Sequence, residues 1–135
     1  MNQLNNINVG SFTKLIKPNI LKKECIKLEP KGTQLILDTR EEIKNILEKK
    51  STKKLFIVGP CSIHDIELAK DYGRRLKEIS DQVNDKILVV MRVYFEKPRT
   101  TIGWKGLIND PHLDNSFDVN EGLKQARELL VYLNN

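Results

Sequence analysis

Two short apolar segments, separated by a stretch of helical periodicity, limit the possible folds more than any other feature of the sequence. The first is LFIV at 55–58, and the second begins at Ile87 with ILVVM. Continuous apolar runs rich in β-branched residues are typical of strands buried on both faces, as in parallel sheets. Strand, helix and strand within about 40 residues form a βαβ unit. The sequence therefore predicts an α/β fold with two parallel strands.

Three further helical segments complete the expected layout. Ser62 and Asp65 have the spacing of a capping box, which predicts that the helix between the strands begins just after Ser62. An amphipathic helix is expected over 33–49, preceded by an extension with no core element. A last helix is expected over 120–133, with five apolar residues on one face: Leu123, Ala126, Leu129, Leu130 and Leu133.

The expected division places an N-terminal extension at 1–50 and the α/β part at 51–135. The α/β part would contain strand, helix, strand, a long loop at 96–120 and a final helix. No third strand follows that helix in the sequence. A sheet of two parallel strands leaves edges unpaired and apolar faces uncovered, so we expect little stability from this part alone.

Charge and cysteine content exclude several classes of protein. The net charge of +5 arises from 23 basic and 18 acidic residues spread along the chain. Neither a block of like charges nor aromatic residues interleaved with arginine is present, so nucleic acid is not an expected partner. No apolar run reaches the roughly 18 residues of a membrane span. Cys25 and Cys61 lie far apart without a CxxC motif or a signal peptide, which indicates reduced thiols and a cytoplasmic location.

The second strand leads directly into a cluster of cations and hydroxyls. Within ten residues the sequence contains three cations and two hydroxyls but a single acid, at position 96. These are Arg92, Lys97, Arg99, Thr100 and Thr101. Parallel βα units bind ligands at the carboxyl ends of their strands. Guanidinium and ammonium groups there favour a phosphate or carboxylate ligand.

Alternation of side chains along this strand places Arg92 and Phe95 on opposite faces. A buried arginine at position 92 would require a counter-charge, because an unpaired buried ion costs several kcal/mol. Either Glu96 or an anionic ligand would have to supply that charge.

Cys61 directly follows the first strand, after Gly59 and Pro60. It is either a small buried apolar residue or a reactive group in a site, as a metal ligand or nucleophile. His64 would be a second ligand or would orient the loop. The loop at 96–120 is longer than an ordinary connection, which favours a functional role. Within it, Trp104 is expected to be a lid residue or a loop anchor.

Two long motifs resemble a known enzyme family. GPCSIHD at 59–65 and MRVYFEKPRTTIGWKGLINDPHLDNSF at 91–117 are similar to the class I, metal-dependent 3-deoxy-D-arabino-heptulosonate-7-phosphate (DAHP) synthases of enteric bacteria. The resemblance implies a (β/α)8 TIM barrel. It also implies a transferase that condenses phosphoenolpyruvate with erythrose 4-phosphate and releases phosphate, the first step of the shikimate pathway to chorismate and the aromatic amino acids.

The resemblance also assigns expected roles. Cys61 would be a ligand of a divalent metal, which is Mn, Fe, Co or Zn in the complete enzyme. Arg92 and Lys97 would bind phosphoenolpyruvate, and Arg99 and Thr100 would bind erythrose 4-phosphate. Lys97 would also transfer a proton. His64 is not a ligand in the family. An aromatic amino acid effector and homo-oligomer contacts through the N-terminal extension are further implications.

The length of the chain matches only part of such an enzyme. Its 135 residues would supply the first two βα units of the (β/α)8 barrel, preceded by the helical extension, so the barrel would be incomplete. The other metal ligands would come from later strands. We therefore expect the chain to be inactive alone and to hold metal weakly. The alternative is a non-catalytic remnant that keeps only regulatory or subunit contacts.

Overall fold

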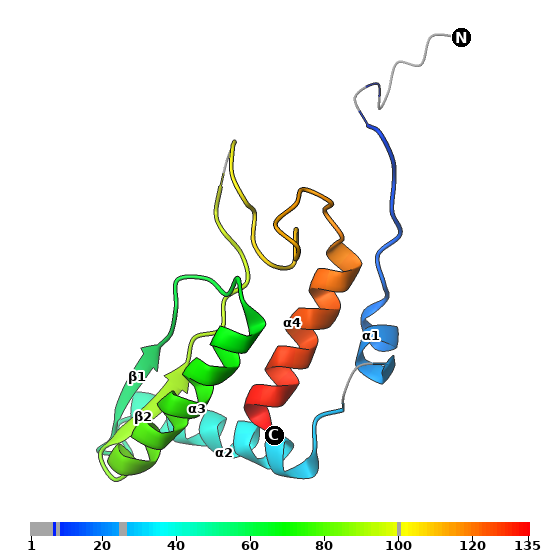
Figure 1. The fold of residues 1–135 in the computed structure, drawn as a ribbon. Coiled ribbons are helices and arrows are strands. Elements are labelled where there is room, and N and C mark those ends of the chain that lie inside the picture. Colours follow the sequence, from blue (N-terminus) through cyan, green and yellow to red (C-terminus); the bar gives the residue numbers. More distant parts are fainter. Residues whose placement is uncertain (1–6, 8, 25–26, 100) are drawn as a thin grey trace.

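Two parallel strands and four helices form the structure, which is a computed structural model describing residues 7, 9–24, 27–99 and 101–135 (Figure 1). In chain order the elements are α1 (Pro18–Glu24), α2 (Pro30–Leu47), β1 (Lys54–Val58), α3 (Ile66–Val83), β2 (Ile87–Met91) and α4 (Val119–Asn134). The α/β class and the order of the expected elements are confirmed. Among the described residues, no helix has the length and hydropathy needed to cross a bilayer.

Strands β1 and β2 pair in parallel, with Lys54 opposite Ile87 and Val58 opposite Met91. Helix α3 connects them and contacts β2, and α4 packs beside α3. The loops that follow the two strands leave the sheet at the same end, whereas α2 lies at the other end and contacts β1 and α4 (Figure 1). This arrangement gathers the segments after both strands into one region.

Helix α3 begins later than the capping-box spacing predicts. Its N-cap is Asp65, whose carboxylate accepts a hydrogen bond from the Leu68 amide at 2.9 Å, and the helix starts at Ile66. The prediction of a start after Ser62 was wrong because the intervening segment is extended. The Ile63 amide donates to the Tyr94 carbonyl at 2.7 Å, a pairing that a helical turn would break.

Removing this cap gives a first testable prediction. Asp65→Ala is expected to lower the free energy of unfolding by about 1 kcal/mol, because the Leu68 amide loses its acceptor. Urea denaturation measures the change. The matched control is Asp81→Ala, which removes an exposed acid paired with Lys77 in the last turn of α3. That change should stay within about 0.5 kcal/mol, and equal losses in the two variants would refute a capping role for Asp65.

The N-terminal part contains more helix than expected. Helix α2 begins at Pro30 and ends at Leu47, so it starts before the expected residue 33 and ends before residue 49. Proline suits this first position because its missing amide would have no partner there. The extension also contains the short helix α1, which the apolar patches did not predict. The domain boundary at residue 50 stays a prediction.

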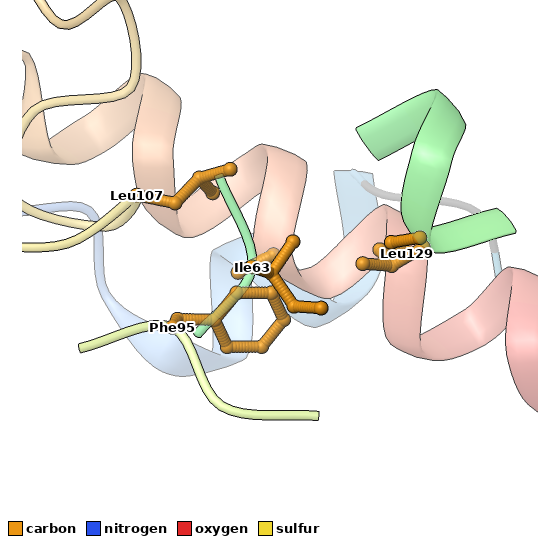
Figure 2. Close-up of a cluster of buried hydrophobic side chains, with 6 residues drawn as sticks. Ile63, Phe95, Leu107 and Leu129 are labelled. Carbon is orange, nitrogen blue, oxygen red and sulfur yellow. The ribbon is translucent and has the colours of Figure 1, made fainter. Parts of the chain in front are cut away.

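A small apolar core lies between the loops and α4. Its buried members are Ile63, Ala69, Phe95, Leu107, Ala126 and Leu129. Figure 2 shows Phe95 against Ile63, with Leu107 and Leu129 around them. Three of the four labelled side chains come from loops rather than from strands, which means that the core fixes the backbone on which the polar residues stand.

The face expected for the last helix is correct except at one position. Ala126 and Leu129 are buried, but Leu130 is 37% exposed, and Val131 is buried in its place. On β1, Phe56 and Ile57 are 50% and 63% exposed. A groove of about 710 Å³ also runs along β2 between α2 and α3. Within the described residues each strand pairs with one neighbour only, as expected for an open two-stranded sheet.

Candidate functional site

The segments that follow β1 and β2 lie against each other. The Arg92 amide donates to the Val58 carbonyl at 2.7 Å, which continues the strand pairing by one step. A Cβ atom at Gly59 would lie 2.3 Å from the Arg92 carbonyl oxygen, so only glycine permits this approach. The sequence Gly59-Pro60-Cys61 therefore runs directly beside the start of the cationic loop.

Arg92 is exposed, and its guanidinium group holds the end of β1 in place. Its Nη1 donates to the carbonyl oxygens of Pro60 and Cys61, both at 2.9 Å, and the group lies 4.8 Å from the ring centroid of Tyr94. The condition of a buried Arg92 is not met, because β2 ends at Met91 and leaves position 92 beyond the sheet. Glu96 forms no salt bridge with it among the described residues, so the alternative of Glu96 as its counter-charge is not supported.

Lys97 and Cys61 come together at the strand ends. Lys97 Nζ donates to Cys61 Sγ at 3.5 Å, although the residues are 36 positions apart. The thiol is free and exposed, so the alternative of a small buried residue at position 61 is wrong. Two of the residues that the motifs single out are thus within contact distance, while His64 is exposed on the adjoining turn.

The loop after β2 folds back on itself as a short antiparallel pair. Glu96 bridges to Gly106, the Lys97 amide donates to the Lys105 carbonyl at 2.8 Å, and the Leu107 amide donates to the Phe95 carbonyl at 2.9 Å. Gly106 has a φ of 122°, and a Cβ there would lie 2.1 Å from the Phe95 oxygen. This pairing fixes Lys97 on one side and Lys105 on the other.

Arg99 occupies the tip of this loop. The aliphatic part of its side chain passes over Gly103, where an added Cβ would lie 3.0 Å from Arg99 Cδ. Lys105 Nζ donates to the Arg99 carbonyl at 2.7 Å. Sequence reasoning did not identify Lys105, since only the pairing across the loop brings it back to residue 99. Thr100 lies outside the described residues, so its assigned role stays a prediction.

Trp104 anchors the base of the loop. Its indole Nε1 donates to the Asp110 carbonyl at 2.7 Å, and its ring packs against the apolar core. The loop-anchor alternative is therefore the one that the contacts support.

Further along the same loop, the hydroxyl and the amide of Ser116 both donate hydrogen bonds to the exposed Asp114 carboxyl. The hydroxyl contributes most, and together they lower the pKa of this carboxyl. These contacts order a long connection that has no helix or strand of its own.

The charge of the site is unbalanced. None of its four cations, Arg92, Lys97, Arg99 and Lys105, forms a salt bridge with a carboxylate in the part of the chain that the structure describes. By contrast, Arg74 and Arg75 on α3 both pair with Asp71. Cations without carboxylate partners are suited to binding a phosphate or carboxylate ligand.

Cys61 is the one candidate metal ligand that the motifs single out among the described residues. Cys61 supplies a soft sulfur ligand of the kind that binds Zn or similar divalent metals. No group of three or more His, Cys, Asp or Glu residues capable of holding a metal occurs among the described residues. They therefore do not form a metal site by themselves.

The core and the site alternate along the same segments. Cys61 lies two residues from buried Ile63, Lys97 two residues from buried Phe95, and Lys105 two residues from buried Leu107. Each of these polar site residues is within two residues of a side chain held in the apolar core. Packing of the apolar cluster thus determines where the sulfur and the ammonium groups lie.

Comparison with known proteins identifies related sequences over most of the chain. A family model described as the DAHP synthetase I family matches residues 29–131. The Tyr-sensitive phospho-2-dehydro-3-deoxyheptonate aldolase of Escherichia coli (strain K12) is 48% identical over 132 residues, covering 98% of this chain and 37% of the relative. The Phe-sensitive aldolase of the same organism is 43% identical with the same coverage.

A solved structure is similar as well. Phospho-2-dehydro-3-deoxyheptonate aldolase from Francisella tularensis SCHU S4 matches with a TM-score of 0.89 and 46% identity, covering 94% of this chain and 37% of that one. The chain thus spans just over a third of the length of these relatives. The match extends to the N-terminal helices as well as to the strands and loops.

Proposed function

This chain belongs to the DAHP synthetase I family, and we propose that it supplies the first two βα units of a (β/α)8 barrel that makes DAHP. The reaction would join phosphoenolpyruvate to erythrose 4-phosphate with water and release phosphate. The observation that carries this proposal is that Arg92 and Lys97 both contact Cys61 at the strand ends, with Arg99 further along the same loop. None of the three forms a salt bridge with a carboxylate among the described residues. Both substrates carry a phosphate group, and one also carries a carboxylate.

Each cation has a place in the proposed site. Arg92 and Lys97, which both contact Cys61, would bind phosphoenolpyruvate. Arg99 at the loop tip, together with Thr100, would bind the phosphate of erythrose 4-phosphate. An ammonium group held near the strand ends is also suited to moving a proton to or from a reacting carbon. Lys97 is therefore the proposed catalytic residue.

Cys61 is the proposed metal ligand. A divalent metal of the Mn, Fe, Co or Zn group, when bound, would polarise the aldehyde of the sugar phosphate. Its remaining ligands would come from outside the described residues, among which no group of three or more His, Cys, Asp or Glu residues could hold a metal. Cys61 is exposed and directly follows the Gly59-Pro60 turn, which leaves its sulfur open to such a metal.

Cobalt binding tests the assignment of Cys61. The 135-residue chain alone is expected to show no thiolate-to-cobalt absorption band at micromolar Co²⁺, because a single ligand holds metal weakly. Addition of a separately produced polypeptide with the remaining barrel strands of the Escherichia coli relative should produce the band. Cys61→Ala should abolish it, and Cys25→Ala serves as the matched thiol control. A band that survives Cys61→Ala would exclude this cysteine as a ligand.

Turnover tests the proposed function itself. The chain alone is expected to be inactive, whereas the chain mixed with the remaining strands should release phosphate from the two substrates at roughly 1 per second or more. Activity that needs the wild-type chain and falls with Arg92→Ala would support the assignment. A folded mixture that neither binds phosphoenolpyruvate nor turns over would contradict it.

A non-catalytic role in subunit or effector contacts is the second candidate. Large apolar side chains on the N-terminal segment support it, since Ile7 and Phe12 are 73% and 80% exposed. The two Escherichia coli relatives are named as Tyr-sensitive and Phe-sensitive, so an aromatic amino acid is the proposed effector. A chain that assembles with a full-length relative but never supports turnover would favour this role, and a strictly monomeric chain would count against it.

A further inference from the structure

We propose that Lys105 is a positioning residue: its ammonium group holds the Arg99 carbonyl, and this contact fixes the loop tip that presents Arg99 to a phosphate. The clamp itself is a matter of loop geometry. Its consequence for phosphate rests on the function proposed above. Lys105 belongs to no part of that proposal as a ligand of either substrate.

The backbone pairing places Lys105 where it can act in this way. Its carbonyl accepts from the Lys97 amide at 2.8 Å, and the next residue, Gly106, bridges to Glu96. These contacts fix the position of the Lys105 backbone relative to the start of the loop. From that fixed point Nζ reaches across and donates to the Arg99 carbonyl at 2.7 Å.

The loop tip has little other support. The Arg99 amide donates to the Lys97 carbonyl at 2.7 Å, a contact that closes only a very short turn. Beyond it, Ile102 is 88% exposed and Gly103 has a positive φ, so the tip has no apolar anchor at that point. Among the described residues, the hydrogen bond from Lys105 joins this tip to the paired part of the loop.

Lys105 has a hydrogen-bond partner that carries no charge. It is half-buried and has no carboxylate partner among the described residues. By comparison, Lys77 on α3 has a side chain that is 67% exposed and pairs with Asp81. The carbonyl of Arg99 is the acceptor for the Lys105 ammonium group, in a hydrogen bond at the surface of the loop. The same bond orders the residue that is proposed to bind phosphate.

The test compares Lys105→Met with Lys105→Arg, using Lys77→Met as the control. Methionine keeps an unbranched apolar stem but has no donor, whereas arginine retains N–H donors for the carbonyl. In ¹⁵N-labelled chain, Lys105→Met is expected to raise the exchange rate of the Arg99 amide about tenfold and to weaken binding of inorganic phosphate about tenfold. Lys105→Arg should restore most of both, and the control should change neither. Unchanged thermal unfolding would show that the effect is local, and Lys105→Leu, which also lacks a donor, replaces the methionine variant if that variant does not fold.

Each outcome separates the clamp from the proposed function. An Arg99 amide that exchanges equally in wild type and in folded Lys105→Met would overturn the clamp, whatever the affinity for phosphate. Faster exchange in a chain whose wild type binds no phosphate would support the clamp and count against the phosphate site. Phosphate binding that weakens equally in Lys105→Met and Lys105→Arg would also overturn the proposal, because it would indicate a direct ligand role that only lysine fulfils.

Discussion

Gly106→Ala is expected to lower the free energy of unfolding by about 3–5 kcal/mol, combining overpacking with a strained backbone. The φ of 122° lies in a region that alanine rarely adopts, and the new Cβ would lie 2.1 Å from the Phe95 carbonyl oxygen. That oxygen accepts the Leu107 amide, so relief of the clash requires breaking the pairing of the loop. The buried side chains of Phe95 and Leu107 would then both be displaced from the core.

Urea denaturation followed by circular dichroism measures this effect. With a slope of about 1.5 kcal/mol per molar urea, the midpoint should fall by about 2 M or more. The matched control is Gly10→Ala, since nothing lies within 4 Å of a Cβ at that position. Its midpoint is expected to stay within error of the wild type. Equal midpoints for the two variants would show that the loop pairing contributes nothing to stability.

The parallel strands, and the contact between polar residues that follow their carboxyl ends, were predictable from the sequence. Two apolar runs separated by a helix leave few alternatives to a βαβ unit, and parallel strands direct their carboxyl ends to the same edge. The approach of Lys97 to Cys61, at 3.5 Å, follows from that topology. The sequence was sufficient here because the order strand, helix, strand determines that the carboxyl ends of both strands lie at the same edge of the sheet.

The environment of each side chain was less predictable. Alternation correctly separated Arg92 from Phe95, but it gave no sign that the strand stops at Met91 and leaves Arg92 exposed. Where a strand ends depends on tertiary contacts, including the hydrogen bonds from Arg92 to the end of β1. Burial of residues next to a strand end is therefore a property of the packed chain.

Loop pairing was beyond the reach of the sequence for a related reason. The bond from Lys105 to Arg99 depends on the antiparallel pairing of Glu96 with Gly106, which no periodic pattern marks. The glycine at position 106 was the one signal in the sequence, and a glycine alone does not show which residues pair across a turn. The N-cap of α3 is likewise Asp65 rather than Ser62, because the Ile63 amide donates a hydrogen bond to the Tyr94 carbonyl.

Replacement of Lys97 has the largest expected effect on activity. In a barrel completed with the remaining strands of the Escherichia coli relative, Lys97→Met should lower turnover by about 10²–10⁴-fold, the contribution of a positioned proton-transfer group. It should also weaken binding of phosphoenolpyruvate, because a charge near the strand ends is lost. Steady-state release of phosphate and a separate binding titration measure the two effects.

Lys97→Arg separates the two proposed roles of this residue. A guanidinium group keeps the positive charge that is proposed to bind phosphoenolpyruvate, yet it does not give up a proton near neutral pH. We therefore expect binding within about tenfold of wild type but turnover as low as in Lys97→Met. Lys77→Met, on the exposed face of α3, is the control for loss of a lysine elsewhere. If Lys97→Arg retains near-wild-type turnover, this residue binds substrate by its charge alone, and the proton must move through another group.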